Sequence, residues 1–333
     1  MRLRWIPGGK APRMRTVVLM YHRVAAVSSD PWQLAVSAAH FEEQLRVLER
    51  NYRVISAGEL VDRLARRELL PNSVCLTFDD GYGDNYRTAL PLLEKYHCPA
   101  TFFMVTGWVG RRARFWWDVL ADVLLNADTL PETIRIGADS FDLAGEALHS
   151  SELQRKHRQW HHPADPPTRR AAVYLAIYEK LKCRTPEEQA HAVAYLLSLA
   201  NLEYQEEDSL PVTKAQLIQM SHHPLAEIGL HTHSHPALGS QSPERQSEEI
   251  GTCANYLKGI TGRVVPMISF PHGNYNQDTL RLVKEHQLRA AFTTEEQAVS
   301  QRTDPYRLGR FQVGDWNGET FGRKLMDWMG GSL

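Results

Sequence analysis

Residues 74–81 read VCLTFDDG, a short apolar run that ends in two adjacent aspartates and a glycine. A run of this length and composition predicts a buried strand, with Asp79 and Asp80 just beyond its carboxyl end. Further strand-like runs occupy residues 16–20, 53–55, 100–105, 226–230, 267–270, 290–293 and 308–313. Because segments with helical spacing lie between them, the chain predicts an α/β fold with a parallel sheet, open or closed into a barrel.

Four polar clusters each follow one of these predicted strands. They are Tyr21-His22-Arg23, Asp79-Asp80-Gly81, His231-Thr232-His233-Ser234-His235 and Pro271-His272-Gly273. The carboxyl ends of parallel strands gather at one edge of such a fold, where active sites form. We therefore expect the four clusters to share one site.

The adjacent carboxylates of Asp79 and Asp80 indicate a cation. Two carboxylates about 4 Å apart repel by about 4 kcal/mol at an effective dielectric near 20, so keeping both ionised requires a nearby positive charge. Gly81 allows the chain to turn so that both side chains reach one point. A solvated turn is the alternative, since Asp-Gly pairs are common in turns.

The histidine run 231–235 favours a metal site. His231 and His235 share a face if the segment is helical, whereas His231 and His233 share one if it is extended. Two neutral imidazoles and one carboxylate suit a borderline cation such as zinc and leave a position open for water or substrate. Solvated histidines brought together by chance are the alternative.

Composition excludes several classes of protein. The 333 residues carry 38 Lys and Arg against 39 Asp and Glu, a balance that argues against a nucleic-acid binder. No apolar run is long enough to span a membrane. The basic N-terminus, with Arg2, Arg4, Lys10, Arg13 and Arg15, is followed by no apolar stretch typical of a secretory signal, so we expect a cytoplasmic protein.

Residues 111–212 differ from the rest of the chain because helical segments dominate. We interpret them as a mostly helical insertion into a single catalytic domain whose core is about 14–110 and 213–333. A basic, aromatic stretch lies at its start, with Trp108, Phe115, Trp116, Trp117, Arg111, Arg112 and Arg114. Core packing explains such a stretch; the alternative is a surface that stacks on sugars or makes peripheral contact with a membrane.

The motifs resemble those of the polysaccharide deacetylases, carbohydrate esterase family 4, also called the NodB homology domain. Thr77-Phe78-Asp79-Asp80-Gly81 matches the family's first motif, and His231-Thr232-His233-Ser234-His235 matches the second. Ser269-Phe270-Pro271-His272-Gly273 resembles the third. The resemblance covers about 16–109 and 213–333, leaves the insertion outside, and implies a distorted (β/α)7-type barrel.

The resemblance also implies roles for individual residues. Asp79 would be the general base, and Asp80, His231 and His235 would bind one divalent metal, for which zinc is our expectation. Pro271 and the backbone N–H of His272 would bind the substrate oxyanion. The implied reaction is hydrolysis of acetyl groups from N-acetylated sugars in a polysaccharide, an oligosaccharide or a lipid-linked precursor.

Two departures from the family pattern point to its exopolysaccharide-associated branch. The arginine that orients the base is Ser269 here, and Arg310, after another predicted strand, is the candidate to replace it. The late histidine that supplies the general acid is absent. We assign that role to His22, with His272 as a weaker candidate; His22 bonded to Asp79 or to backbone is the structural alternative.

Two other functions compete with a sugar deacetylase. A carbohydrate-binding pseudoenzyme would explain the divergent third motif, although the retained Asp79, which binds no metal in the family, counts against it. A related C–N hydrolase acting on a non-acetyl amide would retain the same metal ligands. Acetate release distinguishes a sugar deacetylase from the pseudoenzyme, and a panel of amide substrates distinguishes it from the other C–N hydrolase.

Overall fold

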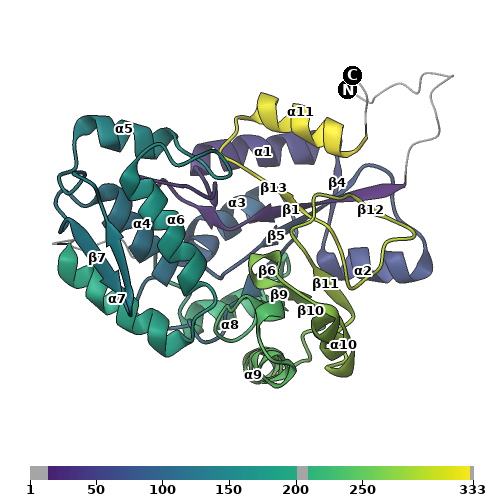
Figure 1. Ribbon diagram of the computed structural model, residues 1–333. Coiled ribbons are helices and arrows are strands. Elements are labelled where there is room, and N and C mark those ends of the chain that lie inside the picture. The colour runs from purple at the N-terminus through teal and green to yellow at the C-terminus, as the bar shows by residue number, and fades with distance from the viewer. Residues whose placement is uncertain (1–13, 201–208, 331–333) are drawn as a thin grey trace.

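The computed structural model describes residues 14–200 and 209–330, and a curled, mainly parallel sheet lies at its centre (Figure 1). Its strands follow the order β11 (Ala290–Phe292), β10 (Met267–Ser269), β9 (Ala226–Leu230), β6 (Ala100–Met104), β5 (Ser73–Phe78) and β1 (Arg15–Tyr21). Two short strands extend it: β4 (Arg53–Ile55) beside β5, and β12 (Val299–Ser300), antiparallel to β1. The basic residues before Met14 lie outside the described residues.

A short segment near the C-terminus joins the two edges of the sheet. Leu308 bridges Phe292 of β11, and β13 (Phe311–Gln312) pairs in parallel with β1. Residues 308–312 thereby close the sheet, and the predicted distorted (β/α)7-type barrel is confirmed. Arg310 lies within this closing segment, which brings it to the barrel interior.

Helices cover the outside of the barrel. They are α1 (Ala38–Asn51), α3 (Leu90–Lys95), α8 (Lys214–His222), α9 (Pro243–Thr261), α10 (Gln277–Glu285) and α11 (Gly318–Trp328). In β1, Val17 and Leu19 belong to the core cluster that contains Phe41 of α1, whereas Val18 belongs to a second cluster with Phe103 and α2 (Ala57–Arg66). Side chains of β1 are thus buried on both faces, as in other parallel barrels.

Left-handed residues end two of the helices. Ser56 caps α2, which ends at Arg66 because Arg67 has a left-handed φ of 59°. Likewise α9 ends before Gly262, whose φ is 69°. Pro91 lies in the first turn of α3, which continues directly from a π-helix over Asn85–Ala89.

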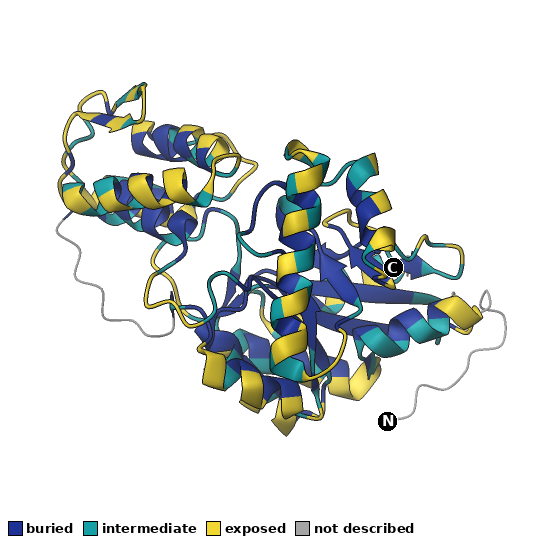
Figure 2. Cartoon of the chain, turned by 90° about the horizontal axis from the view of Figure 1, so that it is seen from below, coloured by how far each residue is buried: buried dark blue, intermediate teal, exposed yellow. Residues whose placement is uncertain are grey.

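Residues 111–200 form a helical lobe beside the barrel (Figure 2). It contains α4 (Trp116–Asn126), α5 (Ser151–Gln159), α6 (Arg169–Leu181) and α7 (Pro186–Leu199). A hairpin of β7 (Thr133–Ile136) and β8 (Asp139–Asp142), which we did not predict, completes it. The lobe has its own core cluster, separate from those of the barrel.

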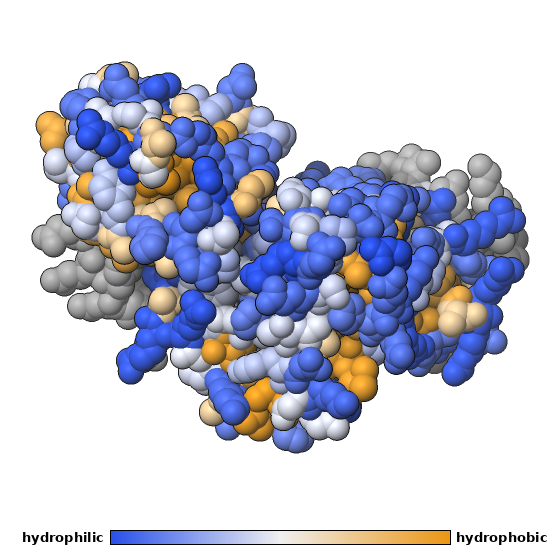
Figure 3. Space-filling view, turned by 60° about the horizontal axis from the view of Figure 1, so that its bottom comes forward, coloured by the Kyte–Doolittle hydropathy of each residue, from blue (hydrophilic) through white to orange (hydrophobic). Residues whose placement is uncertain are grey.

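The aromatic stretch at the start of the lobe is a packing element. Phe115, Trp116 and Trp117 are buried in the core of the lobe, while Arg111 and Arg112 are exposed. Because these rings are buried, they favour the packing interpretation of the stretch, and membrane contact stays a prediction. On the face that Figure 3 shows, hydrophobic residues lie in separate groups among hydrophilic ones. None of the described helices combines the length and apolarity needed to cross a bilayer.

Candidate metal centre

Asp80, His231 and His235 meet at one point at the carboxyl ends of β5 and β9. The Nε2 atoms of His231 and His235 lie 3.4 Å and 3.3 Å from the same oxygen of Asp80. All three side chains are buried, and one ligand atom of each lies within 4.8 Å of the others. The structure therefore brings together the three residues that the sequence indicated as ligands.

Left-handed backbone conformations create this convergence. Asp80 has a φ of 73° and Gly81 one of 77°, and a Cβ at Gly81 would lie 2.7 Å from Met104 Sδ. Thr232 and His235 have φ values of 65° and 66°, so residues 231–235 are neither helical nor extended. Both conformations considered for this segment were wrong, although the helical one paired the two histidines that meet.

His233 takes no part in the cluster. Its Nδ1 lies 3.2 Å from Thr106 Oγ1, on the other side of the loop. The kinks at Thr232 and His235 aim His231 and His235 inward and His233 away. Spacing alone could not distinguish His233 from its neighbours.

The donor set fits a divalent metal. His231 Nδ1 lies 2.8 Å from the Ser269 carbonyl oxygen, so Nδ1–H donates there and leaves the Nε2 lone pair facing Asp80. Zinc–ligand bonds of about 2.0–2.1 Å at tetrahedral angles would place two ligand atoms about 3.4 Å apart, and the separations here agree. His235 Nδ1 is buried without a hydrogen-bond partner among the described residues.

Asp79 lies beside the cluster and is held by Arg310. The two guanidinium nitrogens of Arg310 donate to the two oxygens of Asp79 at 2.8 Å and 2.7 Å, and Ser269 Oγ donates to Asp79 at 3.1 Å. Burial would raise the pKa of Asp79, but the charge and hydrogen bonds of Arg310, together with the nearby His231 and His22, outweigh it and lower that pKa to about 2. Asp79 is therefore ionised at neutral pH.

Arg310 occupies the position that we suggested for it. It is fully buried, and it also donates to Thr293 O at 3.0 Å, Thr77 Oγ1 at 3.1 Å and Ser269 Oγ at 2.8 Å. These bonds fix the plane of the guanidinium. The serine at position 269 completes this network.

His22 and His272 lie in the same cavity. His22 Nδ1 is buried and has no hydrogen-bond partner among the described residues. This nitrogen therefore bonds neither to Asp79 nor to the backbone of those residues. His272 Nε2 is likewise buried and unbonded, and its ring lies 4.6 Å from that of His235. Burial lowers the pKa of both histidines against the opposing pull of Asp80, so both are neutral at rest.

Pro271 places the His272 backbone at the rim of the cavity. Pro271 to Gly273 form a single 3₁₀ turn after β10, and His272 has a φ of 56° within it. Pro271 is buried, and the turn is closed by bonds from Gly273 N and Asn274 N. The third cluster of the sequence thus reaches the site.

A cavity of about 440 Å³ lies above the cluster of Asp80, His231 and His235, and the helical lobe forms one of its walls. The lobe contributes Trp117, His162, Tyr178, Glu179 and Lys182; the other side includes Trp32, Thr294, Glu296 and Gln312. The sequence analysis named Trp117 within the aromatic stretch but missed the other wall residues. Nothing in their local patterns shows which elements will face the strand ends.

Comparison with known proteins identifies similar chains. The sequence profile described as polysaccharide deacetylase matches residues 66–139 and 176–291. It therefore extends into both ends of the insertion, and our placement of all of 111–212 outside the resemblance was too broad. Bacillus subtilis YxkH is 22% identical over 322 residues, covering 96% of this chain and 78% of YxkH.

Other relatives carry functional names. Poly-beta-1,6-N-acetyl-D-glucosamine N-deacetylase of Staphylococcus aureus is 26% identical over 211 residues, 60% of this chain and 68% of that protein. Streptococcus pyogenes deacetylase PplD superposes with a TM-score of 0.59 at 20% identity, covering 93% of this chain and 98% of PplD. IcaB from Ammonifex degensii superposes with a TM-score of 0.58 at 19% identity, covering 95% of this chain and 97% of IcaB. These two structures support the fold.

Proposed function

This chain belongs to the polysaccharide deacetylase family, and from that membership we propose that it is a metal-dependent hydrolase that removes acetyl groups from N-acetylated sugars. The observation that carries the proposal is the pairing of Arg310 with Asp79 directly beside the Asp80, His231 and His235 cluster. A metal site alone would serve binding or structure. A buried, ionised carboxylate next to it, whose two oxygens are held by Arg310 and which lies 3.9 Å from His231 Nε2, serves proton transfer.

Asp80, His231 and His235 would hold the metal, for which zinc is our proposal. When bound, a divalent metal supplies Lewis acidity to the acetyl carbonyl and lowers the pKa of water. Asp79 accepts the proton of the attacking water, and its bonds to Arg310 and Ser269 fix the oxygen that receives it. The His272 backbone N–H stabilises the oxyanion as the water oxygen bonds to the carbonyl carbon.

The C–N bond then breaks, and the departing amine needs a proton. We propose that His22 donates it. Because burial lowers its pKa, His22 is neutral at rest, so it takes up the proton that Asp79 accepted from the water and passes it to the leaving nitrogen. Its buried Nδ1, which has no hydrogen-bond partner among the described residues, can exchange that proton. Acetate and a free amino sugar are the products.

The substrate class follows from the relatives. Deacetylases of poly-β-1,6-N-acetylglucosamine are among them, so we propose an N-acetylhexosamine polymer, oligomer or precursor as substrate. A cytoplasmic location and a lipid-linked precursor stay predictions. A carbohydrate-binding pseudoenzyme needs no ionised Asp79, and the Arg310 pairing favours turnover over that alternative.

Acetate release from β-1,6-linked N-acetylglucosamine oligomers tests the proposal. We expect release by the wild-type chain loaded with zinc, and a loss of at least about 100-fold in Asp79→Asn and in His22→Gln. The control His233→Gln should retain activity, because His233 points away from the site. No release from sugars, together with turnover of a non-acetyl amide, would contradict the proposed substrate class.

A further inference from the structure

The helical lobe touches a predicted metal ligand through Trp117, which lies in the first turn of α4. The ring centroid of Trp117 lies 4.7 Å from that of His235, and the two ring planes are 46° apart. Resting on the metal site of the proposed function, we infer that Trp117 is a positioning residue whose indole sets the orientation of the His235 imidazole. The lobe is then part of the metal centre as well as a wall of the cavity.

The two histidines of the cluster are oriented in different ways. His231 Nδ1 bonds to Ser269 O at 2.8 Å, so a carbonyl of the barrel fixes the angle of its ring. His235 Nδ1 is buried and has no hydrogen-bond partner among the described residues. The rings of Trp117 and His272 lie beside it instead, at 4.7 Å and 4.6 Å. Ring contacts therefore take the place that an acceptor has for His231.

A positioning residue must itself be held, and Trp117 is. Its Nε1 donates to Tyr82 Oη at 2.7 Å, and its ring stacks on that of Phe115 at 4.6 Å with the planes 9° apart. The side chain is 5% exposed. His272, the other neighbour of His235, has a buried Nε2 without a partner among the described residues. Trp117 is thus the better anchored of the two rings.

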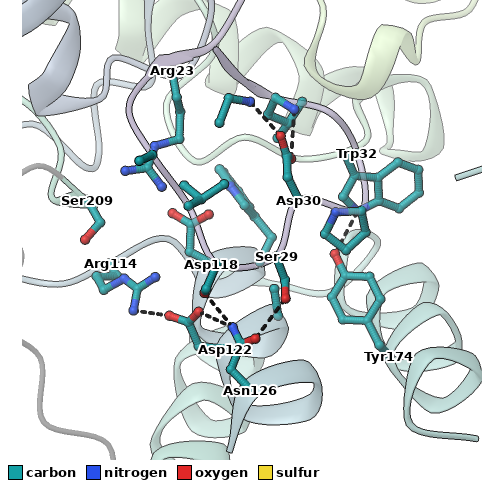
Figure 4. Close-up of a pocket in the computed structure, with 18 residues that line it drawn as sticks. Arg23, Ser29, Asp30, Trp32, Arg114, Asp118, Asp122, Asn126, Tyr174 and Ser209 are labelled. Carbon is teal, nitrogen blue, oxygen red and sulfur yellow. Dashed lines mark hydrogen bonds and ion pairs between the residues drawn. The ribbon is translucent and has the colours of Figure 1, made fainter. Parts of the chain in front are cut away.

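The bond to Tyr82 connects Trp117 to the other ligand loop. Tyr82 is two residues after Asp80, beyond the end of β5, whereas His235 follows β9. Trp117 therefore spans from the loop of one predicted ligand to the imidazole of another. Tyr82 Oη in turn donates to Asp118 Oδ1 at 3.3 Å, and Asp118 lines the neighbouring cavity of about 620 Å³ shown in Figure 4.

Zinc titration against a competing chelator tests the inference. Trp117→Leu removes the ring and its bond to Tyr82 but keeps an apolar side chain. Because groups that orient a metal ligand typically change affinity about 10–100-fold, we expect zinc affinity to fall about tenfold. Trp117→Phe returns a ring to the position and should recover most of the loss. Unchanged zinc affinity in a folded Trp117→Leu would overturn the inference.

Trp160→Leu is the matched control for loss of packing in the lobe. Trp160 is 4% exposed, belongs to the same core cluster as Trp117, and lines neither cavity. Its ring packs on Tyr174, which is not a predicted metal ligand. We expect zinc affinity equal to that of the wild type. A loss equal to that of Trp117→Leu would show that lobe packing alone sets the affinity, and would overturn the inference.

The visible spectrum of the chain loaded with Co²⁺ gives a readout that a purely structural role would not change. The absorption bands of bound Co²⁺ depend on the arrangement of its ligands. A less stable lobe lowers the fraction of folded molecules but leaves the band positions of those molecules unchanged. We expect displaced bands in Trp117→Leu and wild-type bands in Trp160→Leu. Wild-type bands in both variants would contradict a positioning role.

A smaller change tests the same contact and decides the question if Trp117→Leu does not fold. Tyr82→Phe removes the acceptor of Trp117 Nε1 and leaves every ring in place. Because one hydrogen bond that holds the indole is lost, we expect zinc affinity to fall about fivefold.

Tyr174→Phe is the control for Tyr82→Phe. The Tyr174 hydroxyl also accepts an indole N–H, at 2.8 Å from Trp32 Nε1, as the dashed line in Figure 4 shows. Trp32 lies in the loop between β2 (Arg23–Val24) and β3 (Ala35–Val36), and its ring packs on Tyr178, which is not a predicted ligand. We expect wild-type zinc affinity. Equal affinities in the two tyrosine variants would overturn the inference.

Measuring metal binding separates this inference from the proposed reaction. A wild-type chain that binds zinc but releases no acetate would contradict the proposed function alone, and the variants above would still decide the role of Trp117. A wild-type chain that binds no zinc would overturn the metal site and this inference together.

Discussion

At the scale of single residues, Arg310 is the main group that keeps the proposed base ionised. Asp79 is buried next to another carboxylate, a setting that raises a carboxyl pKa. The charge and hydrogen bonds of Arg310, together with the nearby His231 and His22, reverse this effect, and the pKa of Asp79 falls to about 2. Arg310 lies just before β13 and pairs with Asp79, and we propose that it takes the role that the family pattern gives to position 269, where this chain has serine.

Arg310→Gln should shift the acid limb of the pH–rate profile upward. Asp79 must be ionised to accept a proton, so activity is present above its pKa and is lost as the pH falls through it. Without the guanidinium, only the neighbouring histidines oppose the effect of burial, so the pKa of Asp79 rises; we expect a shift of about 1–3 pH units in the acid limb of kcat/KM. Arg310→Lys, which retains a charge but not the paired bonds, should shift less.

If Arg310→Gln and the wild type have the same acid limb in their pH–rate profiles, the proposed effect of Arg310 on the pKa of Asp79 is contradicted. Metal content should remain near one ion per chain in both variants. Arg310 bonds to Asp79 and Ser269, which are not predicted metal ligands, and reaches the ligands only through these two residues. Loss of metal would show that the variants perturb the whole site and not the base alone.

The sequence predicts for some residues, and not for others, that they lie in the site. Asp79, Asp80, His231 and His235 follow strands directly, so the polarity of the parallel sheet already places them together. Arg310 was predictable as a candidate for the same reason. Trp32 was not, because its position depends on bonds from His162 and Tyr174, which lie more than 100 residues away in a separate lobe.

At the scale of elements, α9 holds the loop that carries two ligands. The Glu249 carboxylate, 1% exposed, accepts bonds from His233 N at 2.9 Å, Ser234 N at 2.7 Å and Ser234 Oγ at 2.6 Å. Arg245 donates to the same carboxylate at 2.7 Å. These bonds hold the kinked backbone between His231 and His235.

Glu249→Ala should weaken metal binding, because the loop loses the acceptor that fixes its conformation. Outer groups of this kind typically change metal affinity about 10–100-fold, and we expect a loss in that range. Zinc titration against a competing chelator measures it. Glu248→Ala is the control: Glu248 also pairs with Arg245, but it is exposed and does not contact the loop.

Equal metal affinity in Glu249→Ala and wild type would contradict this role. The chain sequence could not reveal it, since Glu249 is one of several acidic residues in a helix and only tertiary packing selects it. The same limit explains the wrong conformations considered for residues 231–235. The sequence suggested a helical or an extended segment. Instead, four hydrogen bonds, three to the Glu249 carboxylate and one from His235 N to Thr232 Oγ1, fix a loop that has neither conformation.

At the scale of the whole molecule, barrel closure assembles the site. Asp80 and His231 are 151 positions apart, and the helical lobe lies between them in the chain. The barrel could be predicted because alternating strands and helices leave few topologies. The lobe could be recognised as helical, but its contact with the cavity could not, because it depends on how two cores dock.

The most direct test of the account is elemental analysis of the intact chain, comparing wild type, His235→Ala and His233→Ala. We predict about one zinc or other divalent ion per chain in wild type and in His233→Ala, and near none in His235→Ala. Asp79→Asn should also retain its metal while losing turnover. Equal metal content in His235→Ala and His233→Ala would contradict the assignment of Asp80, His231 and His235 as the metal ligands.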